Sequence, residues 1–144
     1  MHLAQANVAT MRATYDDPLM DDFLEQLDPI NALADSSPGF VWRLVGDDVD
    51  AYAARLFGID RMLFNMSVWQ SVEALEAYVY NSNHIGVLRR RNKWFEKPAR
   101  SPFVLWWVDE GHVPTIDEAK ERFDLLWNNG PSPSAFTFSS RFDP

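Results

Sequence analysis

Cysteine is absent from this sequence of 144 residues, which excludes disulfide bonds, thiolate metal sites and a cysteine nucleophile. No run of eighteen apolar residues occurs, so no helix that crosses a membrane is expected. The spacings HxH and HExxH are also absent, which gives no basis for a three-ligand zinc site. Because neither a phosphate loop nor a GxGxxG motif is present, nothing predicts a nucleotide site.

Basic residues are few. Thirteen lysines and arginines stand against 21 acidic residues, and the formal net charge is −8. A surface with this charge repels nucleic acid and anionic lipid over long range, so we expect neither nucleic acid nor a membrane as a partner. The stretch MHLAQANVAT lacks the basic and apolar regions of a secretory signal, and the cytoplasm is therefore the expected compartment.

Hydrophobic residues are abundant. They make up 47% of the chain and aromatic residues 14%, with six tryptophans and ten phenylalanines. This content excludes a disordered chain, and the length suits a single core. We therefore expect one domain over residues 1–144, with residues 130–144 as an extended tail. So many aromatic side chains indicate a ligand cavity or a large partner interface.

Four strands and four helical segments are predicted from hydrophobic periodicity and capping residues. The strands are expected at residues 2–10, 40–45, 61–69 and 102–108. Three helices are expected to follow the capping residues Asp17, Ser71 and Thr115. A fourth is expected to begin at His84, and Pro29 is expected to kink the first helix or to start a second short one. The acidic stretch 46–54 is expected to be a hairpin connection or an irregular segment.

The element order β-α-β-β-α-β is that of the ferredoxin-like α+β fold, here with an extra C-terminal helix and tail. In this fold helices cover one face of an antiparallel sheet. The other face would expose Leu3, Leu63 and Trp69, and such an apolar surface is rare on a monomer. We therefore expect a homodimer in which two sheets face each other and enclose a barrel. The alternative is that the tail folds over the sheet through Phe136 and Phe138.

Polar side chains interrupt the predicted strand 61–69. Alternation places Asn65, Ser67 and Trp69 on one face, opposite a wholly apolar face. Gln5 and Asn7 of the first strand are expected to lie beside them. Because helices are expected on the apolar face, this mixed face should meet a second subunit and line a ligand pocket. The alternative interpretation is that Asn65 and Ser67 only bond across strands or at a wet interface.

Further candidates come from three parts of the chain. His84 is the best catalytic candidate, because imidazole titrates near neutrality and binds metals and heme. Arg91 falls on an aromatic helix stripe and would pair with a ligand carboxylate, although a solvated helix face is the simpler explanation. Trp42 and Trp106 are candidate pocket walls, and alternation sends Trp106 and Trp107 to opposite faces, so only one of these two can border the pocket.

At these residues the sequence resembles a known superfamily. The passage SVWQSVEALEAYVYNSNH resembles the strand-to-helix passage of the dimeric α+β barrel proteins, which include antibiotic-biosynthesis and heme-degrading monooxygenases. The stretches DPINALADSSPGFVWRL, NMSVWQSVEAL, LRRRNKWF and LWWV resemble an uncharacterised bacterial family (a domain of unknown function) within it, over nearly the whole chain. The resemblance to the heme-degrading branch implies roles for Asn7, Trp69 and His84.

Three functions stay open. The first is a monooxygenase-like enzyme that acts on an aromatic or polyketide-like substrate and requires no cofactor, with heme as the alternative. In it Asn7, Asn65 and Ser67 would orient an oxyanion, and His84 would act as acid and base. The second is a non-catalytic module that binds a small ligand or heme. The third is a structural or regulatory dimer whose polar face is filled by its own side chains.

Overall fold

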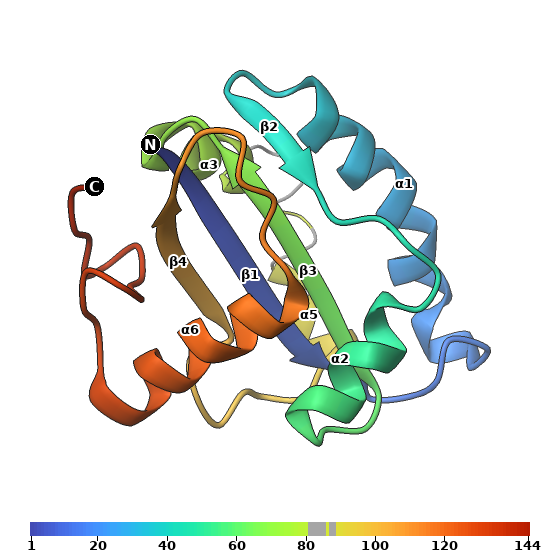
Figure 1. The fold of residues 1–144 in the computed structure, drawn as a ribbon. Coiled ribbons are helices and arrows are strands. Elements are labelled where there is room, and N and C mark those ends of the chain that lie inside the picture. Colours follow the sequence, from blue (N-terminus) through green and yellow to red (C-terminus); the bar gives the residue numbers. More distant parts are fainter. Residues whose placement is uncertain (81–85, 87–88) are drawn as a thin grey trace.

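The computed structural model describes residues 1–80, 86 and 89–144, and Figure 1 shows the fold. Four strands form one antiparallel sheet in the order β2-β3-β1-β4. The strands are β1 (His2–Thr10), β2 (Phe40–Arg43), β3 (Met62–Trp69) and β4 (Phe103–Val108). The helices are η1 (Pro18–Met20), α1 (Asp21–Ser36), α2 (Val49–Phe57), α3 (Val72–Val79), α5 (Arg91–Trp94) and α6 (Ile116–Asn129). The predicted α+β class and ferredoxin-like order are confirmed.

Local capping explains where the helices begin. The Ser71 hydroxyl accepts a hydrogen bond from the backbone N–H of Ala74, and the Thr115 hydroxyl accepts one from Glu118. The Asp17 carboxylate accepts one from the backbone N–H of Leu19 at the start of η1. Each bond satisfies a donor that the first helical turn leaves unpaired. The helix starts predicted after these three capping residues are therefore confirmed.

Two segments differ from expectation. Pro29 lies inside α1, which continues as one helix to Ser36, so no second helix starts there. The expectation of a hairpin or irregular connection at residues 46–54 is wrong, because α2 occupies residues 49–57. Val49, Ala53 and Phe57 follow one another four residues apart and pack against the sheet. This spacing puts them on one side of a helix, and the neighbouring Asp50 carboxylate accepts a hydrogen bond from the backbone N–H of Phe64 in β3.

One face of the sheet, called here the apolar face, is covered by α2 and α6. It carries the side chains of Ala4, Ala6, Met62, Phe64, Met66, Val68, Val104, Trp106 and Val108. Ala53 of α2 and Ala119, Phe123 and Leu126 of α6 complete this core. Figure 1 shows α6 crossing in front of the sheet and α3 behind it.

The opposite face, called here the mixed face, is covered by α1 and α3. Leu3, Trp69 and Leu105 from the strands pack there with Ala34 of α1 and Leu75 of α3. The expectation of helices on one face therefore needs a correction, since the chain covers both faces of its sheet. The physical reason is that α2 and α6 add a helical layer that the β-α-β-β-α-β order alone does not contain.

The apolar area that motivated a homodimer is buried within one chain. Leu3 and Trp69 are each 0% exposed, and Leu63 is partly buried. The tail pairs with the outer edge of β4, where Phe136 and Leu105 exchange two backbone hydrogen bonds of 2.8 and 2.9 Å. As the alternative expectation has it, Phe136 and Phe138 pack in the cluster that holds Leu3 and Trp69. The sheet face therefore does not expose the apolar area from which a dimer was predicted.

Within the described residues, no helix is long and apolar enough to cross a membrane.

Candidate functional site

Four polar side chains lie together on the mixed face, and we call them the polar strip. They are Gln5, Asn7, Asn65 and Ser67. Gln5 pairs with Ser67 across β1 and β3, and Asn7 pairs with Asn65. Directly opposed residues of an antiparallel pair point to the same side of the sheet. The prediction that these four residues share one face thus agrees with the register, although α1 and α3 cover that face and not a second subunit.

The polar strip separates two apolar clusters along the strands. Leu3 and Trp69 lie at one end, in a cluster with α3 that we call the Trp69 cluster. Met11 and Leu63 lie at the other end, in a cluster with the start of α1 that we call the Trp94 cluster. A ligand placed over the strip would therefore meet polar groups in its middle and apolar side chains at both ends, as small-molecule sites commonly provide.

A chain of hydrogen bonds links the strip to Trp69. The Trp69 indole nitrogen Nε1 donates to Ser67 Oγ at 2.8 Å. Gln5 Nε2 donates to the same Ser67 oxygen at 2.7 Å and to Asn65 Oδ1 at 2.8 Å. Gln5 and Ser67 are 4% and 6% exposed, so these bonds satisfy polar groups that burial would otherwise penalise.

The strip has a closed end and an open end. Asn7 and Asn65 are exposed, whereas Gln5 and Ser67 are buried. Asn65 Oδ1 is taken by Gln5, so its amide nitrogen Nδ2 carries two N–H donors on the other side of the amide. Among the described residues, neither Nδ2 of Asn65 nor the Asn7 amide has a hydrogen-bond partner. Two amides without partners therefore lie side by side at the open end.

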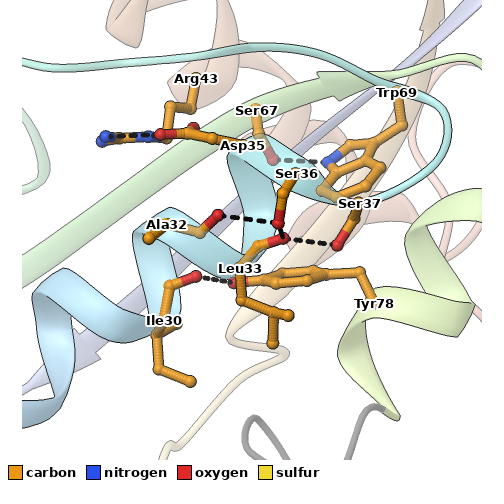
Figure 2. A network of polar contacts seen from close by, with 10 residues as sticks. All are labelled: Ile30, Ala32, Leu33, Asp35, Ser36, Ser37, Arg43, Ser67, Trp69 and Tyr78. Carbon is orange, nitrogen blue, oxygen red and sulfur yellow. Dashed lines mark hydrogen bonds and ion pairs between the residues drawn. The ribbon is translucent and has the colours of Figure 1, made fainter.

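Trp69 is held in a closed aromatic environment. It is 0% exposed, and the Tyr78 ring stacks on it with centroids 5.1 Å apart. Phe40 meets it edge-on at 5.5 Å. The Tyr78 hydroxyl donates to the backbone oxygen of Ile30 in α1, and burial raises the Tyr78 pKa to about 12. Figure 2 shows Tyr78, Ile30 and Trp69 of this group, in which Trp69 donates a hydrogen bond to Ser67 of the strip.

Sequence reasoning missed an ion pair beside the strip. Arg43 pairs with Ser67 across β2 and β3, and its guanidinium donates to the Asp35 carboxylate at 2.8 and 3.3 Å (Figure 2). A bulge shifts the register of β2 between Phe40 and Trp42. Strict alternation would place Phe40 and Arg43 on opposite faces, whereas the bulge brings both onto the mixed face. Arg43 could have been placed on this face only if the bulge had been predicted, and the sequence carries no clear signal for the bulge.

Several predicted site residues lie apart from the strip. Trp42 and Trp106 pack on the apolar face, where Trp106 Nε1 donates to Glu118 at 2.8 Å. Trp107 lies on the mixed face with the Trp69 cluster. Arg91 is exposed on α5. His84 lies outside the described residues.

Two of the residues that the resemblance links to heme, Asn7 and Trp69, lie apart on the sheet. Asn7 pairs with Asn65, whereas Trp69 pairs with Leu3. Four residues of β1 therefore separate them, which is about 13 Å along a strand. Trp69 is also closed off by Tyr78 and Phe40. In the part of the chain that the structure describes, no three His, Asp or Glu side chains form a metal-binding group.

One hollow in the surface lies away from the strip. It is an open pocket of about 330 Å³ lined by Arg100, Ser101, Leu126, Trp127, Pro131 and Thr137. The Arg100 guanidinium stacks over the Trp127 ring, 4.0 Å from its centroid. None of the residues predicted from the sequence lines this pocket, so the polar strip remains the candidate site.

The strip offers a definite chemistry. Its open end presents neutral amide donors, which stabilise negative charge that develops on a ligand oxygen. In the ion pair beside the strip, the charges of Arg43 and Asp35 neutralise each other. Such a site suits a ligand oxygen that becomes anionic during a reaction. It suits a phosphate less well, because a permanently charged phosphate usually binds to a free cation or a helix N-terminus.

Comparison with known families and structures agrees with this fold. The sequence model of a family described as a domain of unknown function, DUF3291, matches residues 2–144. Among curated proteins, none matches the sequence. SnoaB from Streptomyces nogalater, a cofactor-independent oxygenase, is 14% identical with a TM-score of 0.51, over 79% of this chain and 98% of that one.

Two further structures share the architecture. Rv0793 from Mycobacterium tuberculosis is 12% identical with a TM-score of 0.56, over 78% of this chain and the whole of that one (100%). A candidate antibiotic biosynthesis monooxygenase from Chloroflexus aurantiacus is 14% identical with a TM-score of 0.50, over 78% and 98% of the two chains. These likenesses show that the chain shares its α+β fold with those proteins, and the fold is the one that the sequence resemblance predicts.

Proposed function

The chain belongs to the DUF3291 family, and for this member we propose a small-molecule-binding function of the monooxygenase type. Its ligand is an aromatic phenol or enol that lies over the polar strip. One observation carries the proposal: the buried chain Trp69–Ser67–Gln5 holds the exposed Asn65 amide by its oxygen. The amide donors of Asn65 and Asn7 then face the oxygen of the ligand.

The proposed reaction needs no cofactor. Removal of a proton from the phenol or enol gives an anion whose charge is shared between oxygen and a ring carbon. That carbon adds dioxygen, and the resulting peroxide takes back the proton that the base removed, which gives a hydroperoxide. Where the carbon still bears a hydrogen, the hydroperoxide loses water and leaves a carbonyl, so the substrate supplies all four electrons that reduce dioxygen to the carbonyl oxygen and water. The amide donors stabilise the oxyanion, a contribution that is commonly large.

A base must accept the first proton. His84 is the residue that the sequence proposes for it, because neutral imidazole is a good proton acceptor near pH 7. Its position lies outside the described residues, so this role rests on sequence reasoning alone. The fold shared with SnoaB, a cofactor-independent oxygenase, is compatible with the proposed reaction.

Oxygen uptake tests the proposal. The purified protein is incubated with a panel of polycyclic phenols, and dioxygen consumption is followed with an electrode. We expect one or more phenols to be consumed. Asn65→Ala should lower the rate roughly 10²–10³-fold, as loss of an oxyanion donor does elsewhere. Asn128→Ala is the matched control, because Asn128 is an exposed asparagine on α6, away from the strip.

Two results would contradict the proposal. The first is a folded protein that neither consumes nor binds any phenol of the panel. The second is uptake that Asn65→Ala and Asn128→Ala change equally, since this would place the reaction elsewhere on the chain.

A further inference from the structure

Gln5 lies at the closed end of the strip, yet it decides what the open end presents. It is 4% exposed, and both of its amide protons are used, one on Asn65 Oδ1 and one on Ser67 Oγ. A primary amide has two N–H donors, so none remains for a ligand. Gln5 is therefore a residue that acts through its neighbours.

Ser67, the other hydrogen-bond partner of Gln5, is held in place by a second residue. Ser67 Oγ also accepts the Trp69 N–H at 2.8 Å, and an indole can only donate. Trp69 is fixed by Tyr78 and Phe40. The Gln5 amide is thus held against a rigid neighbour, and its second proton points at Asn65.

We propose that Gln5 is the positioning residue that gives the site its polarity, by turning the Asn65 amide so that its N–H donors face outward. This inference rests on the proposed function, because it concerns the same site. Asn65 is exposed and has two edges of opposite character, a carbonyl oxygen and an NH₂ group. With its oxygen bound to Gln5, only the donor edge faces a ligand. Among the described residues, no other side chain hydrogen-bonds to this amide.

The decisive substitution is Gln5→Glu. A carboxylate has nearly the shape of the amide but only accepts hydrogen bonds. It would require Asn65 to turn its NH₂ group inward, which leaves the Asn65 oxygen facing the ligand. The same site would then repel the anion that the natural site stabilises.

Bound p-nitrophenol reports this polarity directly, because its phenol and phenolate forms absorb at different wavelengths. We expect the wild-type protein to bind the phenolate more tightly than the phenol and so to lower the apparent pKa of the bound probe. Gln5→Glu should reduce the ratio of phenolate to phenol affinity at least about tenfold. Gln70→Glu is the matched control, since it adds the same charge at an exposed position directly after β3 and should leave the ratio unchanged.

Side-chain amide hydrogen exchange gives a second readout that needs no ligand. In the wild-type protein the Gln5 NH₂ should exchange slowly and the Asn65 NH₂ quickly, because only the former is buried and bonded. Gln5→Glu should slow exchange at Asn65. If circular dichroism shows that Gln5→Glu does not fold, Gln5→Met takes its place. This variant should leave the Asn65 amide without a preferred orientation, and the pKa of the bound probe should then be close to that of the free probe.

The outcomes separate this inference from the proposed function. If the wild-type protein lowers the pKa of the bound probe and the Gln5→Glu protein lowers it equally, the role of Gln5 is overturned. The proposed site stands in that case. A wild-type Asn65 NH₂ that exchanges as slowly as that of Gln5 also overturns the role of Gln5. Absence of probe binding to the wild-type protein overturns the proposed site, and the role of Gln5 with it.

Discussion

Tyr78 stacks on Trp69 with an interplanar angle of 25° and ring centroids 5.1 Å apart, which joins α3 to the strand that carries the polar strip. The contact places the phenol of Tyr78 between two helices and the sheet, where its hydroxyl reaches Ile30 of α1. Burial there disfavours the tyrosinate and raises the Tyr78 pKa, with a smaller upward contribution from Asp35 and an opposing one from Arg43.

Stability should therefore fall at alkaline pH. The folded-state pKa of Tyr78 is about 12, above the ordinary value of 10.0. Between these values the folded chain binds more protons than the unfolded chain, so its stability is full below pH 10 and declines as the pH rises toward 12. We expect Tyr78 to contribute ~1–2 kcal/mol to this decline. Urea unfolding at a series of pH values measures it.

Tyr78→Phe is the control for that titration. Burial also raises the Tyr15 pKa, so part of the decline should persist in the variant. The difference between the two proteins isolates Tyr78. If both lost stability in parallel from pH 10 to pH 12, the Tyr78 hydroxyl would not be buried as described.

The hydrogen bond from Trp69 to Ser67 predicts a non-additive pair of substitutions. Ser67→Ala leaves the buried Trp69 N–H without an acceptor and should cost about 1–3 kcal/mol. Trp69→Phe removes that donor. The double variant should be more stable than the sum of the two losses implies, because the unpaired donor is gone. Strict additivity in chemical denaturation would show that the two side chains are not bonded.

Neighbouring leucines on α6 test whether this helix covers the sheet. Leu126 is 6% exposed and packs on the apolar face, whereas Leu125 is 38% exposed. Leu126→Ala should lower the free energy of unfolding by about 2–5 kcal/mol, because it opens a cavity. Leu125→Ala changes the same atoms on the same helix and should stay within about 0.5 kcal/mol. Equal losses would mean that α6 does not dock through Leu126.

Two glycines with the same backbone conformation test the contact between α3 and the loop before β2. Gly39 and Gly111 have φ values of 83° and 85°. A Cβ at Gly39 would lie 2.5 Å from the Ala74 Cβ, whereas one at Gly111 would meet nothing within 4 Å. Gly111→Ala should cost about 1–2 kcal/mol from backbone strain alone.

Gly39→Ala should cost clearly more than Gly111→Ala, because α3 must move away from the loop. The difference between the two free energies of unfolding measures the clash, since the backbone strain is common to both. Indistinguishable losses would show that Gly39 and α3 are not in close contact.

Much of the fold could be predicted because its signals are local. β1, β3 and β4 alternate over their whole length, and Ser71 and Thr115 cap helices within one turn. The α2 helix was missed because the acidic residues around it suggested a loop, although Val49, Ala53 and Phe57 have helical spacing.

The candidate site was only partly predictable. Alternation correctly groups Gln5, Ser67 and Asn65 on one face, but it does not say which helices cover that face. That choice depends on how many helical layers the chain can supply, which is a property of the whole fold. The side of Arg43 depends on the bulge in β2, and a single inserted residue reverses every later side chain of a strand.

Because β1 lies between β3 and β4 in the sheet, the protein cannot complete its fold until both of those strands have been synthesised. Leu3 of β1 pairs with Trp69 on one side and with Trp107 on the other. Ribosomes synthesise β1 before either partner strand, so this strand stays unpaired while most of the domain is being made. Pairing over such long separations closes large loops and slows folding. The nascent chain should therefore carry an unpaired strand for an extended period, during which that strand is exposed to wrong pairing and aggregation.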